Sequence, residues 1–179
     1  MNSIHWLPIY FGIIKSGAVA VPLNFRYDTE DIIWSVNFAD IDALVLDARC
    51  VKQVEMGLAK MSRIRSYVFV GEEELCPSFA THFKVAFGQS DKSEPNNLIT
   101  REDDAAIYFS SGTTGAPKAV VYTNGTLEAA CIREQTLHRQ TKEDTFICIP
   151  PLYHVGAKLH WMGNLLVGAK GVLLLGFTV

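Results

Sequence analysis

One loop constrains this chain more than any other feature. Residues 108–118 read Tyr-Phe-Ser-Ser-Gly-Thr-Thr-Gly-Ala-Pro-Lys and lie between two apolar runs, residues 105–109 and 119–122. Glycine lets the backbone approach an anion with dihedral angles that other residues avoid. Hydroxyl and backbone N–H groups donate hydrogen bonds to phosphate oxygens, and a lysine adds a full positive charge. We interpret the loop as a candidate polyphosphate-binding device between two strands.

The spacing of the glycines separates this loop from two common nucleotide-binding motifs. A Walker loop has four residues between its glycines and then Gly-Lys-Ser/Thr, whereas two residues separate Gly112 from Gly115 here. The dinucleotide fingerprint Gly-x-Gly-x-x-Gly is not met either. On composition alone, a flexible surface loop with a solvated Lys118 is the alternative interpretation.

The ordered string decides between these interpretations. It resembles the phosphate-binding signature of the adenylate-forming superfamily, which includes acyl- and aryl-CoA synthetases, luciferases and the adenylation domains of peptide synthetases. The match runs over residues 110–118. The chain departs from the signature at Ala119, where glycine is usual, and at Asn124, where histidine is common. The second departure puts any role of that histidine in doubt.

Two further stretches extend the resemblance and favour its CoA-ligase branch. Residues 2–6 and 13–24 are similar to the family's helix, glycine, strand and Pro-Leu-Asn turn. Residues 150–156, Pro-Pro-Leu-Tyr-His-Val-Gly, are similar to the segment that CoA ligases use beside the acyl group. Peptide-synthetase adenylation domains usually carry a different string there.

The resemblance implies a reaction and its site residues. Such enzymes join a carboxylate to ATP with Mg²⁺, release pyrophosphate, and pass the acyl group to coenzyme A; no metal site made by the protein is expected. Lys118 and His154 are the candidate catalytic residues. For His154 a helix cap or a hydrogen bond in the core is the alternative. The phosphate-binding candidates are Ser110, Ser111, Gly112, Thr113, Thr114, Gly115 and Lys118.

Composition excludes several other classes of protein. The net charge of −3 gives no electrostatic reason to expect a nucleic-acid or anionic-membrane partner. The apolar stretches 7–23 and 161–179 are interrupted by lysine, glycine or proline, so neither is expected to span a membrane. The four cysteines form no C-x-x-C pair, and no secretory signal opens the chain, so we expect reduced thiols in a cytoplasmic protein.

Alternating strand and helix signals predict an α/β fold, with a mainly parallel sheet flanked by helices. We expect a first α/β part over residues 1–70, an irregular connector over 71–104 and a second α/β part over 105–179. Residues 18–21 are predicted to form a strand, and the apolar run 43–46 a strand covered on both faces. Met162, Leu165 and Leu166 are expected to pack in the core.

Length suggests that the resemblance is to part of an enzyme. The 179 residues fit one compact part, and the downstream motifs of the family do not occur in them. We expect a fragment of the large N-terminal domain of an ATP-dependent acyl-CoA synthetase that acts on a fatty or aromatic acid. Alone, it is expected to be inactive and to self-associate through truncated surfaces. The rival is a non-catalytic nucleotide-binding or assembly module, and a luciferase-like or carrier-loading enzyme is a further alternative.

Overall fold

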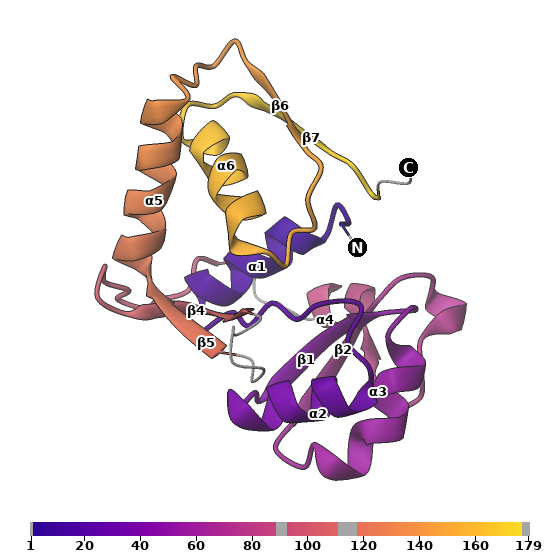
Figure 1. Ribbon diagram of the computed structural model, residues 1–179. Coiled ribbons are helices and arrows are strands. Elements are labelled where there is room, and N and C mark those ends of the chain that lie inside the picture. The colour runs from indigo at the N-terminus through magenta and orange to yellow at the C-terminus, as the bar shows by residue number, and fades with distance from the viewer. Residues whose placement is uncertain (1, 89–92, 111–117, 177–179) are drawn as a thin grey trace. The chain divides into compact units, whose positions relative to one another are not determined.

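The computed structural model describes residues 2–88, 93–110 and 118–176. The chain divides into two compact units, each with its own core. Unit 1 comprises Met1–Pro22 and Pro95–Val179, and unit 2 comprises Leu23–Glu94. Figure 1 shows the elements of both. The expected parts met at residues 70 and 104. In the structure, the first 22 residues belong to the same unit as the C-terminal part of the chain, so unit 2 is inserted within unit 1.

Unit 2 is a small parallel α/β unit. Its strands follow the order β1-β2-β3, with both neighbouring pairs parallel. The strands are β1 (Ala43–Asp47), β2 (Ser66–Val70) and β3 (Thr81–His82); the helices are α2 (Thr29–Phe38), α3 (Val51–Gly57), η1 (Leu58–Lys60), η2 (Glu73–Leu75) and α4 (Phe83–Gly88). Three of these elements, namely η2, β3 and α4, lie in the stretch predicted as an irregular connector. That prediction was therefore wrong for residues 73–88, over which these elements are distributed.

The core of unit 2 is apolar, and its centre is Phe69, whose side chain is fully buried with Val36, Val54 and Met61 around it. Along β1, Leu46 points into this core while Val45 is 38% exposed. The prediction that this strand is covered on both faces was therefore wrong. Alternating side chains face opposite sides of a strand, and one of the two sides is uncovered in the described structure.

The described residues of unit 1 form an antiparallel hairpin, a parallel strand pair and three helices. Figure 1 shows α5 and α6 lying side by side. The elements are α1 (Trp6–Lys15), β4 (Asp104–Ser110), β5 (Lys118–Thr123), α5 (Asn124–Leu137), β6 (Thr145–Cys148), α6 (Val155–Leu166) and β7 (Lys170–Leu173). β6 and β7 are parallel, whereas β4 and β5 are antiparallel. The predicted α/β fold with mainly parallel pairing is confirmed, and the hairpin is its exception.

The strand predicted at residues 18–21 reduces to one parallel bridge between Ala20 and Ala106. Ala20 N–H donates to the Ala105 carbonyl, and Ile107 N–H donates to the Ala20 carbonyl, each over 2.9 Å. The pairing stops there because Pro22 has no N–H to continue the ladder.

The core of unit 1 has two buried clusters. One gathers around Tyr10 and Tyr108, and the other around Leu7 and Leu152. Met162 belongs to the first cluster, as predicted. Leu165 and Leu166 are 42% and 55% exposed, so their expected core packing was wrong. Met162 and Asn164 are buried on the last turns of α6, so Leu165 and Leu166 lie on the exposed side of the helix.

Candidate functional site

The β4–β5 hairpin holds together the two ends of the predicted phosphate loop. Ser110 is the last residue of β4, Lys118 is the first of β5, and the two are register partners. The Ser110 hydroxyl donates to the Lys118 carbonyl over 3.4 Å, and both residues are exposed. A hydroxyl and an ammonium therefore flank the entrance and exit of the loop, an arrangement suited to an anion.

The other predicted phosphate-binding residues lie outside the described residues. They are Ser111, Gly112, Thr113, Thr114 and Gly115. Their assignment stays a prediction that rests on the ordered sequence string.

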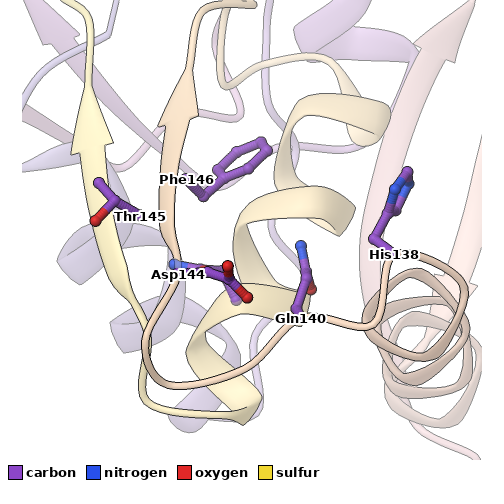
Figure 2. Close-up of a pocket in the computed structure, with 6 residues that line it drawn as sticks. His138, Gln140, Asp144, Thr145 and Phe146 are labelled. Atoms are coloured by element: carbon purple, nitrogen blue, oxygen red, sulfur yellow. The ribbon is translucent and has the colours of Figure 1, made fainter.

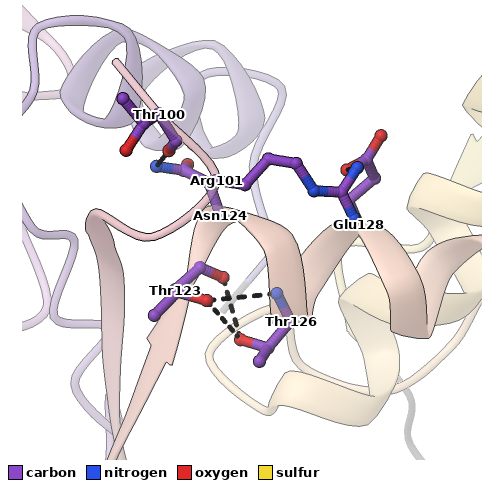
Figure 3. A network of polar contacts seen from close by, with 6 residues as sticks. All are labelled: Thr100, Arg101, Thr123, Asn124, Thr126 and Glu128. Atoms are coloured by element: carbon purple, nitrogen blue, oxygen red, sulfur yellow. Dashed lines mark hydrogen bonds and ion pairs between the residues drawn. The ribbon is translucent and has the colours of Figure 1, made fainter.

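Behind the hairpin, a polar network anchors the start of α5 (Figure 3). The Thr123 hydroxyl accepts a hydrogen bond from the Thr126 N–H over 3.2 Å and thus caps the helix. The Asn124 side-chain amide donates to the carbonyls of Thr100 and Asp103 over 3.1 and 3.2 Å. Asn124, which stands where the family signature often has histidine, thus ties the helix start to the chain before β4.

His154 stands at the N-cap position of α6, with extended backbone. Its side chain makes no capping hydrogen bond and is exposed, so the structure supports neither the cap nor the core alternative. Its backbone N–H donates to the Pro151 carbonyl over 3.1 Å, and its ring centroid lies 4.1 Å from that of Tyr153. Partial burial, and secondarily the charge of Lys158, lower the pKa of His154, which favours a neutral imidazole at neutral pH.

Lys158 is the residue of this region that the sequence analysis missed. Its side chain is 1% exposed, and its ammonium Nζ donates to the Leu152 carbonyl over 2.6 Å. Burial lowers the pKa of Lys158 to about 6. One signal was present: Lys158 precedes Met162 by four residues, which places both on the core face of α6. Lysine is seldom fully buried, so the pattern alone did not identify it.

A concavity of about 330 Å³ lies elsewhere in unit 1 (Figure 2). Its lining includes none of the predicted site residues among those described. Asp144 on its wall accepts hydrogen bonds from the N–H and hydroxyl of Thr141, and the Asn164 side chain donates to the Lys170 carbonyl. These groups stabilise turns around β6 and β7. The lining residues are His138, Gln140, Asp144, Thr145, Phe146 and Asn164.

Two searches of the described residues have negative results. No group of three or more His, Cys, Asp or Glu side chains among them could hold a metal ion. No helix in the described ranges is long and apolar enough to cross a membrane.

Comparison with known proteins gives consistent matches at the level of sequence. The profile of the family described as AMP-binding enzyme matches residues 1–179. A 2-succinylbenzoate–CoA ligase of Bacillus cereus (strain AH820) is 25% identical over 173 residues, which are 97% of this chain and 31% of the relative. A crotonobetaine/carnitine–CoA ligase of Salmonella heidelberg (strain SL476) is 26% identical over 156 residues, or 86% of this chain and 30% of the relative. The chain thus spans about a third of the length of these curated relatives.

Solved structures match the fold over nearly the whole chain. The anthranilate CoA ligase AuaEII in complex with anthranoyl-AMP superposes with a TM-score of 0.88 at 20% identity, covering 99% of this chain and 34% of that one. The inhibitor-bound N-terminal domain of FACL13 from Mycobacterium tuberculosis gives 0.84 at 20% identity, covering 99% and 43%. The profile match over all 179 residues shows that this chain belongs to the AMP-binding enzyme family.

Proposed function

We propose that this chain is part of an acyl- or aryl-CoA ligase, in which it contributes the loop that binds ATP phosphates and one border of the acyl site. One observation carries the proposal. The β4–β5 hairpin places Ser110 and Lys118 side by side at the two ends of a loop whose sequence matches the family signature. The named activities of the curated relatives, which are CoA ligases, support this class of reaction.

The proposed reaction has two steps. A carboxylate oxygen attacks the α-phosphorus of ATP, the bond to the bridging oxygen breaks, and pyrophosphate leaves with the electron pair. The sulfur of coenzyme A, having lost its proton, then attacks the acyl carbon of the adenylate and displaces AMP. The first step brings two anions together, so the protein must position them and stabilise negative charge. Lys118 and the loop hydroxyls would do this at the departing pyrophosphate.

Mg²⁺ would arrive with the triphosphate and be held mainly by it, as is common for this ion. When bound there, it would neutralise phosphate charge. His154, exposed at the start of α6, would border the acyl group with an uncharged ring.

A non-catalytic nucleotide-binding or assembly module that keeps part of the fold is the rival. Carboxylate-dependent ATP–pyrophosphate exchange, measured with a panel of fatty and aromatic acids, distinguishes the two. We expect exchange from a full-length form that contains this chain, and none from the 179-residue chain alone. Nucleotide binding without exchange in every form would favour the rival. Transfer to a carrier protein instead of coenzyme A would favour a carrier-loading enzyme, and light emission a luciferase-like one.

We further propose that the isolated chain associates with copies of itself. Unit 1 exposes apolar side chains on its strands and at its end, among them Val121 at 53%, Ile147 at 51% and Leu175 at 64%. Light scattering over a concentration series should show growing particles; a monomer at all concentrations would contradict the idea. We also propose a cytoplasmic location, because the four cysteines form no C-x-x-C pair in the sequence.

A further inference from the structure

Lys158 occupies a cage of aromatic rings inside unit 1. Its Nζ lies 4.2 Å from the ring centroid of Tyr108, 4.6 Å from that of Trp6 and 5.1 Å from that of Tyr10. The Leu152 carbonyl accepts its hydrogen bond at 2.6 Å. An ammonium over an aromatic face is attracted by the ring quadrupole, and more strongly when water is excluded. The rings and the carbonyl therefore favour the protonated amine, whereas burial opposes it and lowers the pKa of Lys158 to about 6, so the amine loses its charge before the pH rises to neutral.

Asn2 holds the same backbone, that of Leu152, to which Lys158 donates its hydrogen bond. The Asn2 side-chain oxygen accepts from the Leu152 N–H over 2.8 Å, and its amide donates to the carbonyls of Pro150 and Leu174 over 3.1 and 2.9 Å. Asn2 is 6% exposed. Both backbone groups of Leu152 thus bond to buried side chains, one from Asn2 and one from Lys158. We call residues 150–154 the acyl-site segment; they begin the stretch 150–156 that the resemblance places beside the acyl group.

The cage also contacts the strand that leads to the phosphate loop. Tyr108 stands in β4, two residues before Ser110, and its hydroxyl shares a 2.7 Å hydrogen bond with that of Tyr10. One ammonium therefore contacts both β4 and the acyl-site segment, which ends at His154. We propose that Lys158 is a positioning residue that fixes the acyl-site segment relative to strand β4. The effect of Lys158 on acid binding rests on the proposed function. Its effect on the position of the segment does not, because it depends on the fold alone.

The groups that face Lys158 do not supply a countercharge. Burial raises the pKa of Tyr10 to about 12, raises that of Tyr108 further, and raises that of the Cys148 thiol, so all three are neutral at neutral pH. His154 is the other titratable neighbour, and a charge on Lys158 lowers its pKa. Among the described residues, no carboxylate pairs with Lys158. The carbonyl and the three rings are what hold the ammonium, so losing the proton should loosen the segment.

The positioning role is tested first by hydrogen exchange on the 179-residue chain. Lys158→Met keeps the length of the side chain and removes its charge and its donors. Amides of the acyl-site segment should exchange at least about tenfold faster than in the wild type, as expected when a hydrogen bond to a charged group is lost. Amides of unit 2 should not change. The matched control is Lys142→Met, since Lys142 is 78% exposed in the same unit. Unchanged protection of the segment in a folded Lys158→Met chain overturns the proposal.

A measurement on the wild type keeps the test decisive if the variant does not fold. The Lys158 amine and the backbone amide of Tyr153, which shares its peptide bond with the Leu152 carbonyl, are followed by nitrogen NMR from acidic to alkaline pH. The amide should shift with the same midpoint as the amine, because the donor to the carbonyl loses its charge when the proton leaves. An amide signal that ignores the titration of the amine overturns the proposal.

The catalytic meaning is tested in the full-length form by single-turnover adenylation. Lys158→Met should raise the KM for the acid about tenfold, by loss of one charged hydrogen bond, and leave the Kd for ATP unchanged. Lys158→Arg, which keeps a cation and a donor, should recover part of the loss. If the wild type shows no ATP–pyrophosphate exchange with any acid, the proposed function fails. The hydrogen-exchange and NMR results still decide the positioning role in that case. If hydrogen exchange in the segment becomes faster but the KM for the acid does not change, Lys158 positions the segment in the fold and has no part in acid binding.

Discussion

The two compact units of this chain use polar groups in different ways. Both units carry exposed ion pairs, such as Lys60 and Glu30 in unit 2, 2.8 Å apart with side chains that are 62% and 73% exposed. Among the described residues of unit 2, the buried polar side chains are Ser35 and His82, and no lysine is among them. In unit 1, Lys158 is buried in an aromatic cage and Asn2 is buried against three backbone groups. Exposed ion pairs add little stability, whereas buried polar groups must be satisfied and so specify one arrangement.

The two kinds of buried group contribute differently: apolar burial mainly adds stability, whereas buried hydrogen bonds fix the position of a backbone segment. The core of unit 2 around Phe69 gains from apolar burial, which is non-directional. The buried polar groups of unit 1 fix particular backbone segments in hydrogen-bond geometry. Unit 1 also carries all the residues that the family signature assigns to chemistry. We infer that unit 2 is chiefly a packed scaffold and that unit 1 is built around the position of its loops.

The largest expected effect tests whether the two units are stabilised separately. Phe69→Ala removes a fully buried ring from the core of unit 2 and should lower the free energy of unfolding of that unit by about 3–5 kcal/mol. Phe87→Ala is the matched control, because this ring is 62% exposed in the same unit. Urea unfolding followed by hydrogen exchange measures each unit. Equal loss of protection in both units would break the comparison, since it would show one cooperative unit.

The second effect tests whether the chemistry lies in unit 1. In the full-length form, Lys118→Ala should slow adenylation about ten- to hundredfold, as expected when one charged hydrogen bond of about 1.5–3 kcal/mol is lost in the transition state. Transfer of the acyl group from preformed adenylate to coenzyme A should be unaffected, because pyrophosphate has already left. Single-turnover rates of each step provide the measurement.

Lys142→Ala, an exposed lysine of the same unit, serves as the control for that experiment. Adenylation at the wild-type rate, or a defect confined to the transfer step, would show that Lys118 does not act on the pyrophosphate.

Sequence reasoning succeeded where the information is local. The apolar run 43–46 predicted a strand, and β1 (Ala43–Asp47) is that strand. The two strands around the phosphate loop followed from the two apolar runs that the loop joins, although their antiparallel pairing was not predicted. Each of these inferences needs a window of a few residues.

It failed where distant segments meet. Lys158 is surrounded by rings from α1, which lie more than 140 residues earlier in the chain, and by Tyr108 of β4, which lies 50 residues earlier. A single helix pattern contains no trace of them. The strand expected at residues 18–21 failed for a related reason. Its pairing depends on the one short contact between Ala20 and Ala106, which apolar composition does not reveal.

A smaller effect compares the helix caps of the two units. Thr123→Ala in unit 1 and Asp28→Ala in unit 2 each remove a side chain that accepts a hydrogen bond from a helix N–H. Each should lower the free energy of unfolding by about 0.5–2 kcal/mol, since capping is local and does not depend on the unit. Urea unfolding of the variants measures both. Thr136→Ala is the control, because that hydroxyl donates to the Ile132 carbonyl within α5 and its loss should change stability by less than about 0.5 kcal/mol. A cap in unit 1 worth several times the cap in unit 2 would mean that Thr123 supports the hairpin as well as the helix.

The smallest effect is electrostatic and links the cage to the candidate site. Partial burial first, and the charge of Lys158 second, hold the pKa of His154 below its ordinary 6.5. Between that lowered value and 6.5, the unfolded chain binds more protons at His154 than the folded chain does. The contribution of His154 to stability therefore increases as the pH rises through this window, and it is absent below the window. Lys158→Met removes the charge and should raise the pKa of His154 towards 6.5, leaving the shift due to burial. NMR over pH 5 to 8, which brackets the ordinary histidine value, follows the imidazole signals of His154, and His138, the C-cap residue of α5, is the internal reference. A pKa that does not move would show that Lys158 is already uncharged while His154 titrates, and the cage would then hold an amine instead of a cation.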